Sequence, residues 1–305
     1  MRLGRFFIGL AVQLFRAASL DVSLAHMTQS KSMLIRRVFW TFQILEQAYG
    51  CRSDLLGTPM SAWRPIPPFI NDSCPITVSA QVDPTIQPMP DSITSSSDIW
   101  DHTMHLGWIW CMARTYVTNT VLGKTLEPWR TDSQYQQIVS DLMEVETRMP
   151  ICHRYDTVKF YKRQSQEVKA KQEYWRPWLR VQLIYHSTHT VLNHPFIYLG
   201  DSSRTSRFTT SNTFWRKSMD IVLSHATWIT RMIELILRFE IETTDPLFAN
   251  AAALAATVHL YYCCAPSSNL RSQSRKDLAK CLAFVETFVL FSSYCENLVS
   301  LASNL

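Results

Sequence analysis

Glycine is scarce in this chain of 305 residues, which contains only seven. Because glycine supplies the positive φ angles of tight turns, glycine-rich phosphate loops, short hairpins and barrel corners are disfavoured. Proline is confined instead, since eight of the 14 prolines lie between Pro59 and Pro90. Outside that region the chain is free to form long helices, and its 47% hydrophobic content can fill a large core. The composition therefore predicts an all-α, irregular multi-helix domain with one long proline-rich internal loop.

Cysteines at zinc-binding spacing and runs of basic residues are also absent. The eight cysteines include no Cys-x-x-Cys pair, which argues against a zinc module and against a secreted disulfide scaffold. The net charge of +5 is spread along the chain and forms no nucleic-acid-binding arm. No Gly-x-Ser-x-Gly, Walker or dinucleotide-binding motif occurs. We therefore expect a protein that is not an enzyme, without catalytic, cofactor-binding or metal-binding residues.

The spacing of apolar residues predicts a series of helices separated by polar or proline-rich links. Pro177 is expected to kink or break one of them, and Asp245 followed by Pro246 is a strong helix start. We expect 151–165 to be mostly loop, and 59–97 to be an extended arm followed by a disordered loop within one domain. The predicted helices cover approximately residues 4–20, 32–49, 98–122, 132–149, 166–193, 212–240, 245–264 and 274–301.

Two apolar segments leave open a membrane-associated helical protein. The N-terminus resembles a signal peptide, but Gln13 and Arg16 interrupt its apolar run. The segment 247–265 carries Asn250, Thr257 and His259 and is barely long enough to span a bilayer. Core helices are favoured at both places, and Phe39 and Trp40 are expected to be core aromatic residues.

Two histidine pairs have the spacing that can place two imidazoles on one metal ion. His102 and His105 are three residues apart, as are His186 and His189. Asp98, Asp101 and His194 are candidate third ligands, so a helical metal-dependent enzyme is an alternative function. Ordinary core or surface histidines are favoured, because nothing in the sequence marks a third ligand or an open coordination position.

Several short motifs occur in a fixed order along the chain. Their structural motif residues are Arg36, Arg37, Trp40, Gly57, Pro59, Tyr185, His186, His194, Pro195 and Phe196, with Phe39, His225-Ala226 and Ala255-Ala256-x-Val258-His259 in addition. Together these motifs resemble the fungal-specific transcription factor domain, the middle homology region of fungal zinc binuclear cluster transcription factors. Thr58 and Gln47 depart from that family's usual basic residues.

The resemblance implies a regulatory module that works in the nucleus and controls RNA polymerase II transcription, for example of a metabolic or biosynthetic gene cluster. It implies protein partners, either a second copy as a homodimer or a full-length relative, and a small-molecule effector. Residues 1–305 would form the regulatory domain, truncated at its N-terminus. The family's six-cysteine zinc cluster is not present in this chain. We therefore expect no cofactor here, promoter DNA as an indirect partner only, and no membrane.

Overall fold

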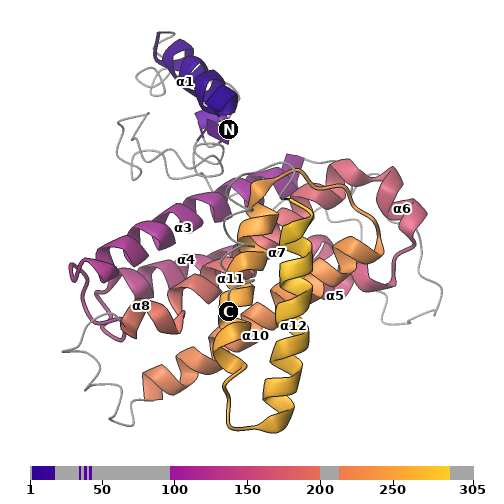
Figure 1. Ribbon diagram of the computed structural model, residues 1–305. Helices are drawn as coiled ribbons and strands as arrows, with labels where there is room; N and C mark the ends of the chain where they lie inside the picture. Colours follow the sequence, from indigo (N-terminus) through magenta and orange to yellow (C-terminus); the bar gives the residue numbers. More distant parts are fainter. Residues whose placement is uncertain are drawn as a thin grey trace.

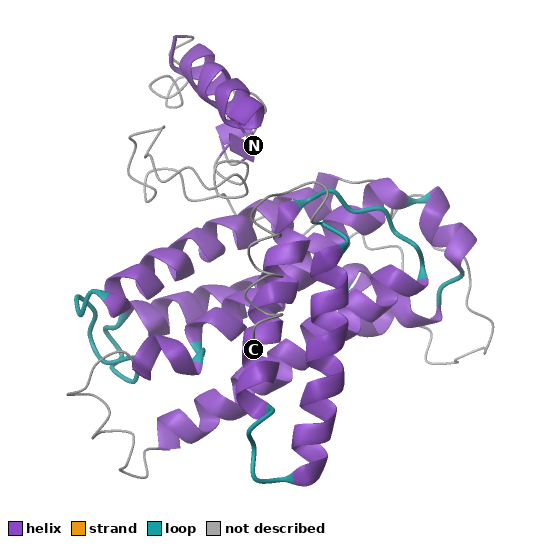
Figure 2. Ribbon diagram, viewed as in Figure 1, coloured by secondary structure: helices purple, strands orange, loops and turns teal. Residues whose placement is uncertain are grey.

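The protein is described by a computed structural model that covers residues 2–17, 34–35, 38–39, 41–42, 97–199 and 213–288. This described part is 81% helical and contains no strand, which confirms the predicted all-α class (Figure 2). The chain order is α1 (Arg2–Ala17), α3 (Ser97–Val121), α4 (Gln134–Arg148), η3 (Ile151–His153), α5 (Tyr155–Val158), η4 (Phe160–Lys162), α6 (Ser165–Ala170), α7 (Gln172–Leu192), α8 (Pro195–Leu199), α10 (Thr213–Arg238), α11 (Pro246–Tyr262) and α12 (Ser268–Glu286).

Helix α7 lies at the centre of the described body. It packs against α3, α10 and α11, and α12 packs in turn on α11 and α10 (Figure 1). Most of its 21 residues are buried, including Trp175 and Trp178, which are fully enclosed. Phe160 packs against both indoles, with ring centroids 4.9 and 5.2 Å away. Since large aromatic side chains bury the most apolar surface, this cluster is a main source of the core's stability.

The predicted helix starts are confirmed where the sequence carries a capping side chain. Asp245 accepts a hydrogen bond from the Leu247 backbone N–H at 3.0 Å, and Pro246 opens α11. Ser133 caps α4 in the same way. The prediction for α12 is wrong, because this helix begins at Ser268, six residues before the expected start. Ser267 provides its N-cap, a signal that the apolar spacing did not reveal.

The segment 151–165 is not the loop that was expected. It forms η3, α5 and η4, with Lys159 in the left-handed region at φ 50° between the last two. Tertiary contacts hold these turns: the Trp178 Nε1–H donates to the His153 carbonyl at 2.8 Å, and Val158 and Phe160 are buried. Local propensity is weak in such short turns, so core packing decides their conformation.

Pro177 does not break the helix as predicted. The break lies at Lys171, between α6 and α7, and Pro177 continues within α7. Because Pro177 is the sixth residue of α7, its missing N–H removes only one helical hydrogen bond near the start. The end of α7 also differs in detail, since Pro195 and Phe196 open a further short helix, α8.

The N-terminal helix α1 confirms the first predicted helix. Phe15 is buried and contacts Phe42 edge to face, with ring centroids 5.9 Å apart. Ile35 and Phe39 are buried as well, so Phe39 is the core aromatic that was expected. Trp40, the end of the second predicted helix and the arm and loop at 59–97 lie outside the described residues. Among the residues that the structure covers, no helix combines the length and the apolar character needed to cross a membrane.

We predict that Trp178→Ala lowers the free energy of unfolding by about 3–5 kcal/mol, because it leaves a cavity among packed rings and strips the His153 carbonyl of its donor. Trp100→Ala is the matched control, since Trp100 is 43% exposed. Urea denaturation of both variants measures the difference. Equal losses in the two variants would show that Trp178 is not a core residue.

Candidate functional site

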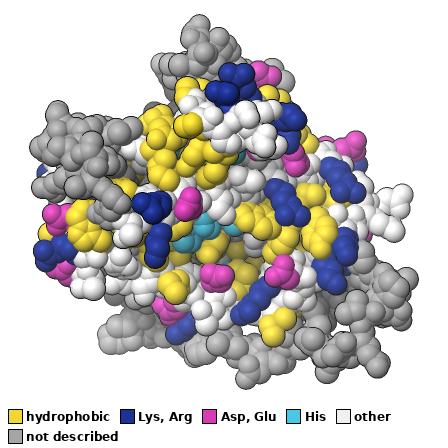
Figure 3. All heavy atoms as spheres, turned by 90° about the horizontal axis from the view of Figure 1, so that it is seen from below, with side chains coloured by type: hydrophobic (Ala, Val, Ile, Leu, Met, Phe, Trp, Pro, Cys, Tyr) yellow, Lys and Arg dark blue, Asp and Glu magenta, His cyan; other side chains and the backbone are white. Residues whose placement is uncertain are grey.

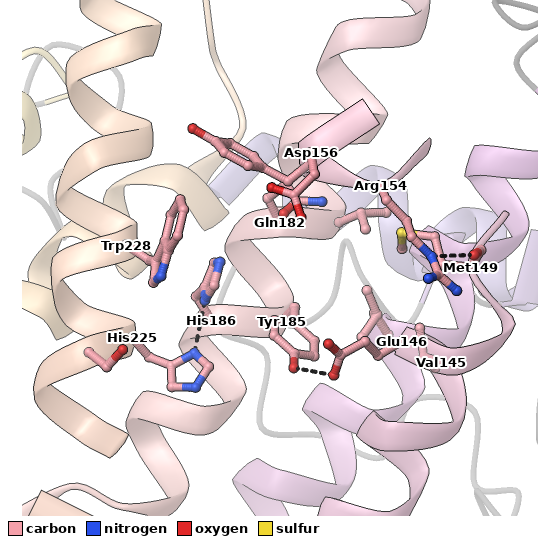
Figure 4. Close-up of a pocket in the computed structure, with 14 residues that line it drawn as sticks. Val145, Glu146, Met149, Arg154, Asp156, Gln182, Tyr185, His186, His225 and Trp228 are labelled. Atoms are coloured by element: carbon pink, nitrogen blue, oxygen red, sulfur yellow. Dashed lines mark hydrogen bonds between the residues drawn. The ribbon is translucent and has the colours of Figure 1, made fainter. Parts of the chain in front are cut away.

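A cavity of about 440 Å³ opens between α4, α5, α7 and α10 (Figure 4). This volume lies within the range of pockets that bind small organic molecules. Its floor is apolar, and its walls carry aromatic and polar side chains. The residues that line it are Leu106, Val145, Glu146, Met149, Arg154, Tyr155, Asp156, Val181, Gln182, Tyr185, His186, Ser224, His225 and Trp228.

Histidines from two helices meet at one wall of this pocket. His186 of α7 and His225 of α10 point toward each other, and their Nδ1 atoms are 2.8 Å apart (Figure 4). One Nδ1 must therefore carry a proton and donate it to the other. His189 stacks on His225 at a ring-centroid distance of 4.2 Å, and His186 lies parallel to Trp228 at 5.6 Å. The rings of His186, His225 and Trp228 line the pocket and form an aromatic wall, and His189 supports this wall from outside the lining.

These histidines are held in the neutral form. Burial, together with His225, lowers the pKa of His189 to about 3. Burial lowers the pKa of His225 to about 4. Burial, with the neighbouring His225 and His189, also places the pKa of His186 well below its ordinary value. At neutral pH these histidines are consequently uncharged. Each neutral ring has one nitrogen that donates a hydrogen bond and one that accepts.

Tyr185 joins this wall to α4. Its hydroxyl donates a hydrogen bond to Glu146 Oε2 at 2.9 Å (Figure 4). Burial and the hydrogen bond to Glu146 both raise the pKa of the Tyr185 hydroxyl, so the phenol is protonated and donates. Glu146 therefore has one of its acceptor positions filled by the protein itself.

The opposite side of the pocket carries charged and polar side chains, of which one is hydrogen-bonded to other described residues and two are not. Arg154 Nε donates to the Met149 carbonyl at 3.1 Å, and its Nη2 donates to the Thr147 carbonyl at 3.2 Å. These bonds hold its guanidinium against the C-terminal end of α4, where a positive charge is favourable. Within the described part of the chain, Asp156 and Gln182 have no hydrogen-bond or ion-pair partner. They are the polar groups that a ligand could satisfy.

A space-filling view of the face below Figure 1 shows how these residue types meet the surface. Histidine side chains are visible in a depression, with hydrophobic side chains on both sides and acidic and basic side chains around them (Figure 3). Apolar surface around a few convergent polar groups is typical of ligand sites.

The structure places the predicted motif residues in three groups. Tyr185 and His186 line the pocket. His194 lies elsewhere: its Nε2 bonds Thr257 Oγ1 at 2.9 Å, and its Nδ1 accepts the Phe196 backbone N–H at 3.3 Å. Burial lowers the pKa of His194 to about 4. His194 thus stabilises the junction between α7 and α8, the helix that begins at Pro195. The motif residues that lie outside the described residues are Arg36, Arg37, Trp40, Gly57 and Pro59.

The two histidine pairs do not assemble the proposed metal ligands. Burial, and then the nearby His153 and His105, lower the pKa of His102 to about 4. The titratable neighbours that shift this pKa are therefore other histidines. His194, a proposed third ligand for the other pair, bonds Thr257 instead. Across the described ranges, no group of three His, Cys, Asp or Glu side chains is arranged to hold a metal ion.

The spacing argument missed most of the pocket. His225 was noted only as part of a motif, and Trp228, Asp156 and Gln182 were not singled out. A partial signal existed, since His225 and Trp228 are three residues apart on one helix and so share a face. The packing of α10 on α7 decides which α7 residues this face contacts. The spacing of residues within α10 does not predict these contacts.

Comparison with known proteins gives no further assignment. No family model, no curated protein and no solved structure matches this chain.

We predict that the protein loses stability as the pH falls from about 6.5 to about 4, because the unfolded chain protonates its histidines in this range while the folded wall stays neutral. A folded pKa below the unfolded one means that stability is complete above the unfolded pKa and decreases below it. His225→Phe keeps the stacked ring but removes one titrating group. The slope of the unfolding free energy against pH should therefore fall by up to about one proton in this variant.

Urea denaturation at a series of pH values measures this slope. Tyr185→Phe is the control, because it removes the bond to Glu146 and leaves all three histidines in place. Identical slopes in the wild type and in His225→Phe would contradict the neutral histidine wall.

Proposed function

We propose that this chain is a ligand-responsive regulatory module of the type found in fungal zinc-cluster transcription factors. One observation carries the proposal: Tyr185 and His186 from one motif, and His225 from another, form a single wall of a pocket large enough for a small molecule. These motifs are 39 residues apart in the chain. Motif residues that meet at a pocket are better explained by binding than by helix formation alone, which would not require them to converge.

The other motif residues within the described part serve the core. Ala255 and Ala256 of α11 are buried, and His259 Nε2 bonds Thr230 Oγ1 at 2.9 Å. Small residues allow α11 to pack closely against α7 and α10. The motifs thus divide into residues that hold the body together and residues that face the pocket.

A ligand in this pocket would bridge α4 and α10, two helices with different neighbours. Helix α4 packs on α3, whereas α10 packs on α7, α11 and α12, and α3 packs in turn on α7. A molecule bound between α4 and α10 favours whichever arrangement of these helices fits it, and this difference in affinity is what shifts a conformational equilibrium. We propose that the shift alters a protein-binding surface and that the module acts in the nucleus through protein partners.

Exposed aromatic side chains supply candidate contact positions for such partners. Trp100, Trp129, Phe196 and Tyr261 are between 40% and 50% exposed. Aromatic residues are enriched at protein interfaces because they bury a large area at a small cost in conformational entropy.

The test is a reporter assay with the chain fused to an unrelated, sequence-specific DNA-binding module. We predict that the fusion changes transcription from a promoter carrying the cognate sites at least about threefold, and that Trp228→Ala, which opens the aromatic wall, abolishes or inverts the change. Leu237→Ala is the control outside the pocket, because Leu237 is 47% exposed on α10, does not line the pocket and is not one of the aromatic contact positions. Immunoblotting must show equal protein levels.

A fusion whose output equals that of the DNA-binding module alone would refute the proposed function. Equal output from the wild type and from Trp228→Ala would show that the pocket does not take part in it.

We also predict that the purified chain binds DNA without sequence preference. Reading base edges requires side chains delivered into a groove, and only a mildly basic surface with a net charge of +5 is available here. Competition between a target promoter and a scrambled duplex at physiological salt measures the preference. A preference of more than about a hundredfold for the target would contradict this prediction.

A further inference from the structure

The polar groups of the pocket differ in whether the protein already satisfies them. Glu146 accepts the Tyr185 hydroxyl, and Arg154 donates to two carbonyls at the end of α4. Asp156, by contrast, has no hydrogen-bond or ion-pair partner among the described residues, and neither does Gln182. Asp156 is exposed, so water solvates its carboxylate when the pocket is empty. A ligand donor that carries positive charge is the group best suited to replace that water, since a carboxylate only accepts and pairs best with a cation.

The apolar part of the pocket restricts the ligand further. Leu106, Val145 and Val181 form a buried floor on which no charged group could be solvated. Tyr155 and Trp228 flank the same space, with ring centroids 5.0 Å apart and the rings nearly perpendicular. Such walls accept a flat hydrocarbon or heteroaromatic group, and their rings also attract cations.

The molecule itself shows that these rings attract a cation. The guanidinium carbon of Arg231 lies 4.9 Å from the Trp228 ring centroid and 5.8 Å from that of Tyr155. Arg231 has no ion pair with any described carboxylate, and it does not line the pocket. The aromatic cluster therefore already contacts one cation, whose side chain is also exposed to solvent.

Electrostatics also disfavours an anion at this position. The lining carries two carboxylates, Glu146 and Asp156, against one cation, Arg154, so the charged side chains of the lining have an excess of negative charge. The histidine wall adds no positive charge at neutral pH, because burial keeps it neutral. A carboxylate ligand would face Asp156, and Arg231, which has no ion pair among the described residues, does not line the pocket.

From these observations we infer that the pocket takes an organic amine: an ammonium group paired with Asp156 and the Gln182 carboxamide, and an aromatic or aliphatic body on the apolar floor. The inference rests on the proposed function in that it takes this pocket to be the effector site. It adds the chemical class of the effector, which the motif resemblance does not specify.

Three probes that share an indole distinguish a cationic ligand from a neutral and an anionic one. Tryptamine carries an ammonium, tryptophol carries a hydroxyl and indole-3-propionate carries a carboxylate at the end of a similar chain. Calorimetric titration of the full chain at pH 7 should show tryptamine binding at least about tenfold more tightly than either of the others, the difference expected for one charge-assisted contact.

Two variants test the residues. Asp156→Asn keeps the shape and removes the charge, so tryptamine affinity should fall at least about tenfold while tryptophol affinity stays the same. Asp220→Asn is the matched control, since Asp220 is an exposed carboxylate on α10 that does not line the pocket. If Asp156→Asn does not fold, Gln182→Leu provides the second test, and it should weaken tryptamine more than tryptophol.

Equal affinities for the three probes, tighter binding of the propionate, an unchanged tryptamine affinity in Asp156→Asn, or no binding of tryptamine up to about 10 mM would each overturn the inference. The reporter assay separates this failure from failure of the proposed function. If the reporter output depends on Trp228 but no amine binds, the inferred amine class is refuted and the proposed regulatory function stands. If an amine binds but the reporter output does not change, the regulatory function is refuted and the binding site stands.

Discussion

Helix α7 is enclosed by α3, α10 and α11, so the polar side chains that it carries inward are stabilised by partners within the protein. Among the described residues, Ser187 Oγ and Trp175 Nε1 have no such partner. Thr188 and Thr190 find their partners locally, by donating to carbonyls four residues earlier. His186 cannot, and it finds its partner in His225 on α10. This hydrogen bond, together with the packing of Trp175 and Trp178, stabilises the position of α10 relative to α7 and of the pocket between them.

The same constraint explains the electrical character of the pocket wall. Burial disfavours the charged imidazolium, and each neighbouring histidine disfavours it further, so the cluster is neutral at physiological pH. A neutral pair still needs one proton between the two Nδ1 atoms, which fixes the tautomers relative to each other. The wall is thereby rigid, aromatic and uncharged, while the unpaired charge of Asp156 lies in α5. Shape and charge recognition are supplied by different elements of the fold.

Local signals in the sequence were sufficient for the fold class and for many helix ends, because an N-cap such as Asp245 acts within a few residues. They failed at 151–165, where the Trp178 indole fixes the backbone from another helix. The pocket shows the same limit. Tyr185 and His186 could be singled out by their motif, but the partner of His186 depends on how α7 and α10 pack. The sequence suggested His189, in the same helix, and His194, just after its end, instead. His189 does support the wall, whereas His194 bonds Thr257 in a different contact.

The central claim is that residues from separate motifs form one ligand-binding wall between α4, α7 and α10. Hydrogen–deuterium exchange with and without saturating tryptamine tests it most directly, because it reports where binding stabilises the backbone. We predict slower exchange in the peptides that contain Glu146 to Asp156, Gln182 to His186 and Ser224 to Trp228, and unchanged exchange in α12. Protection confined to other helices, or spread uniformly over the chain, would contradict the account.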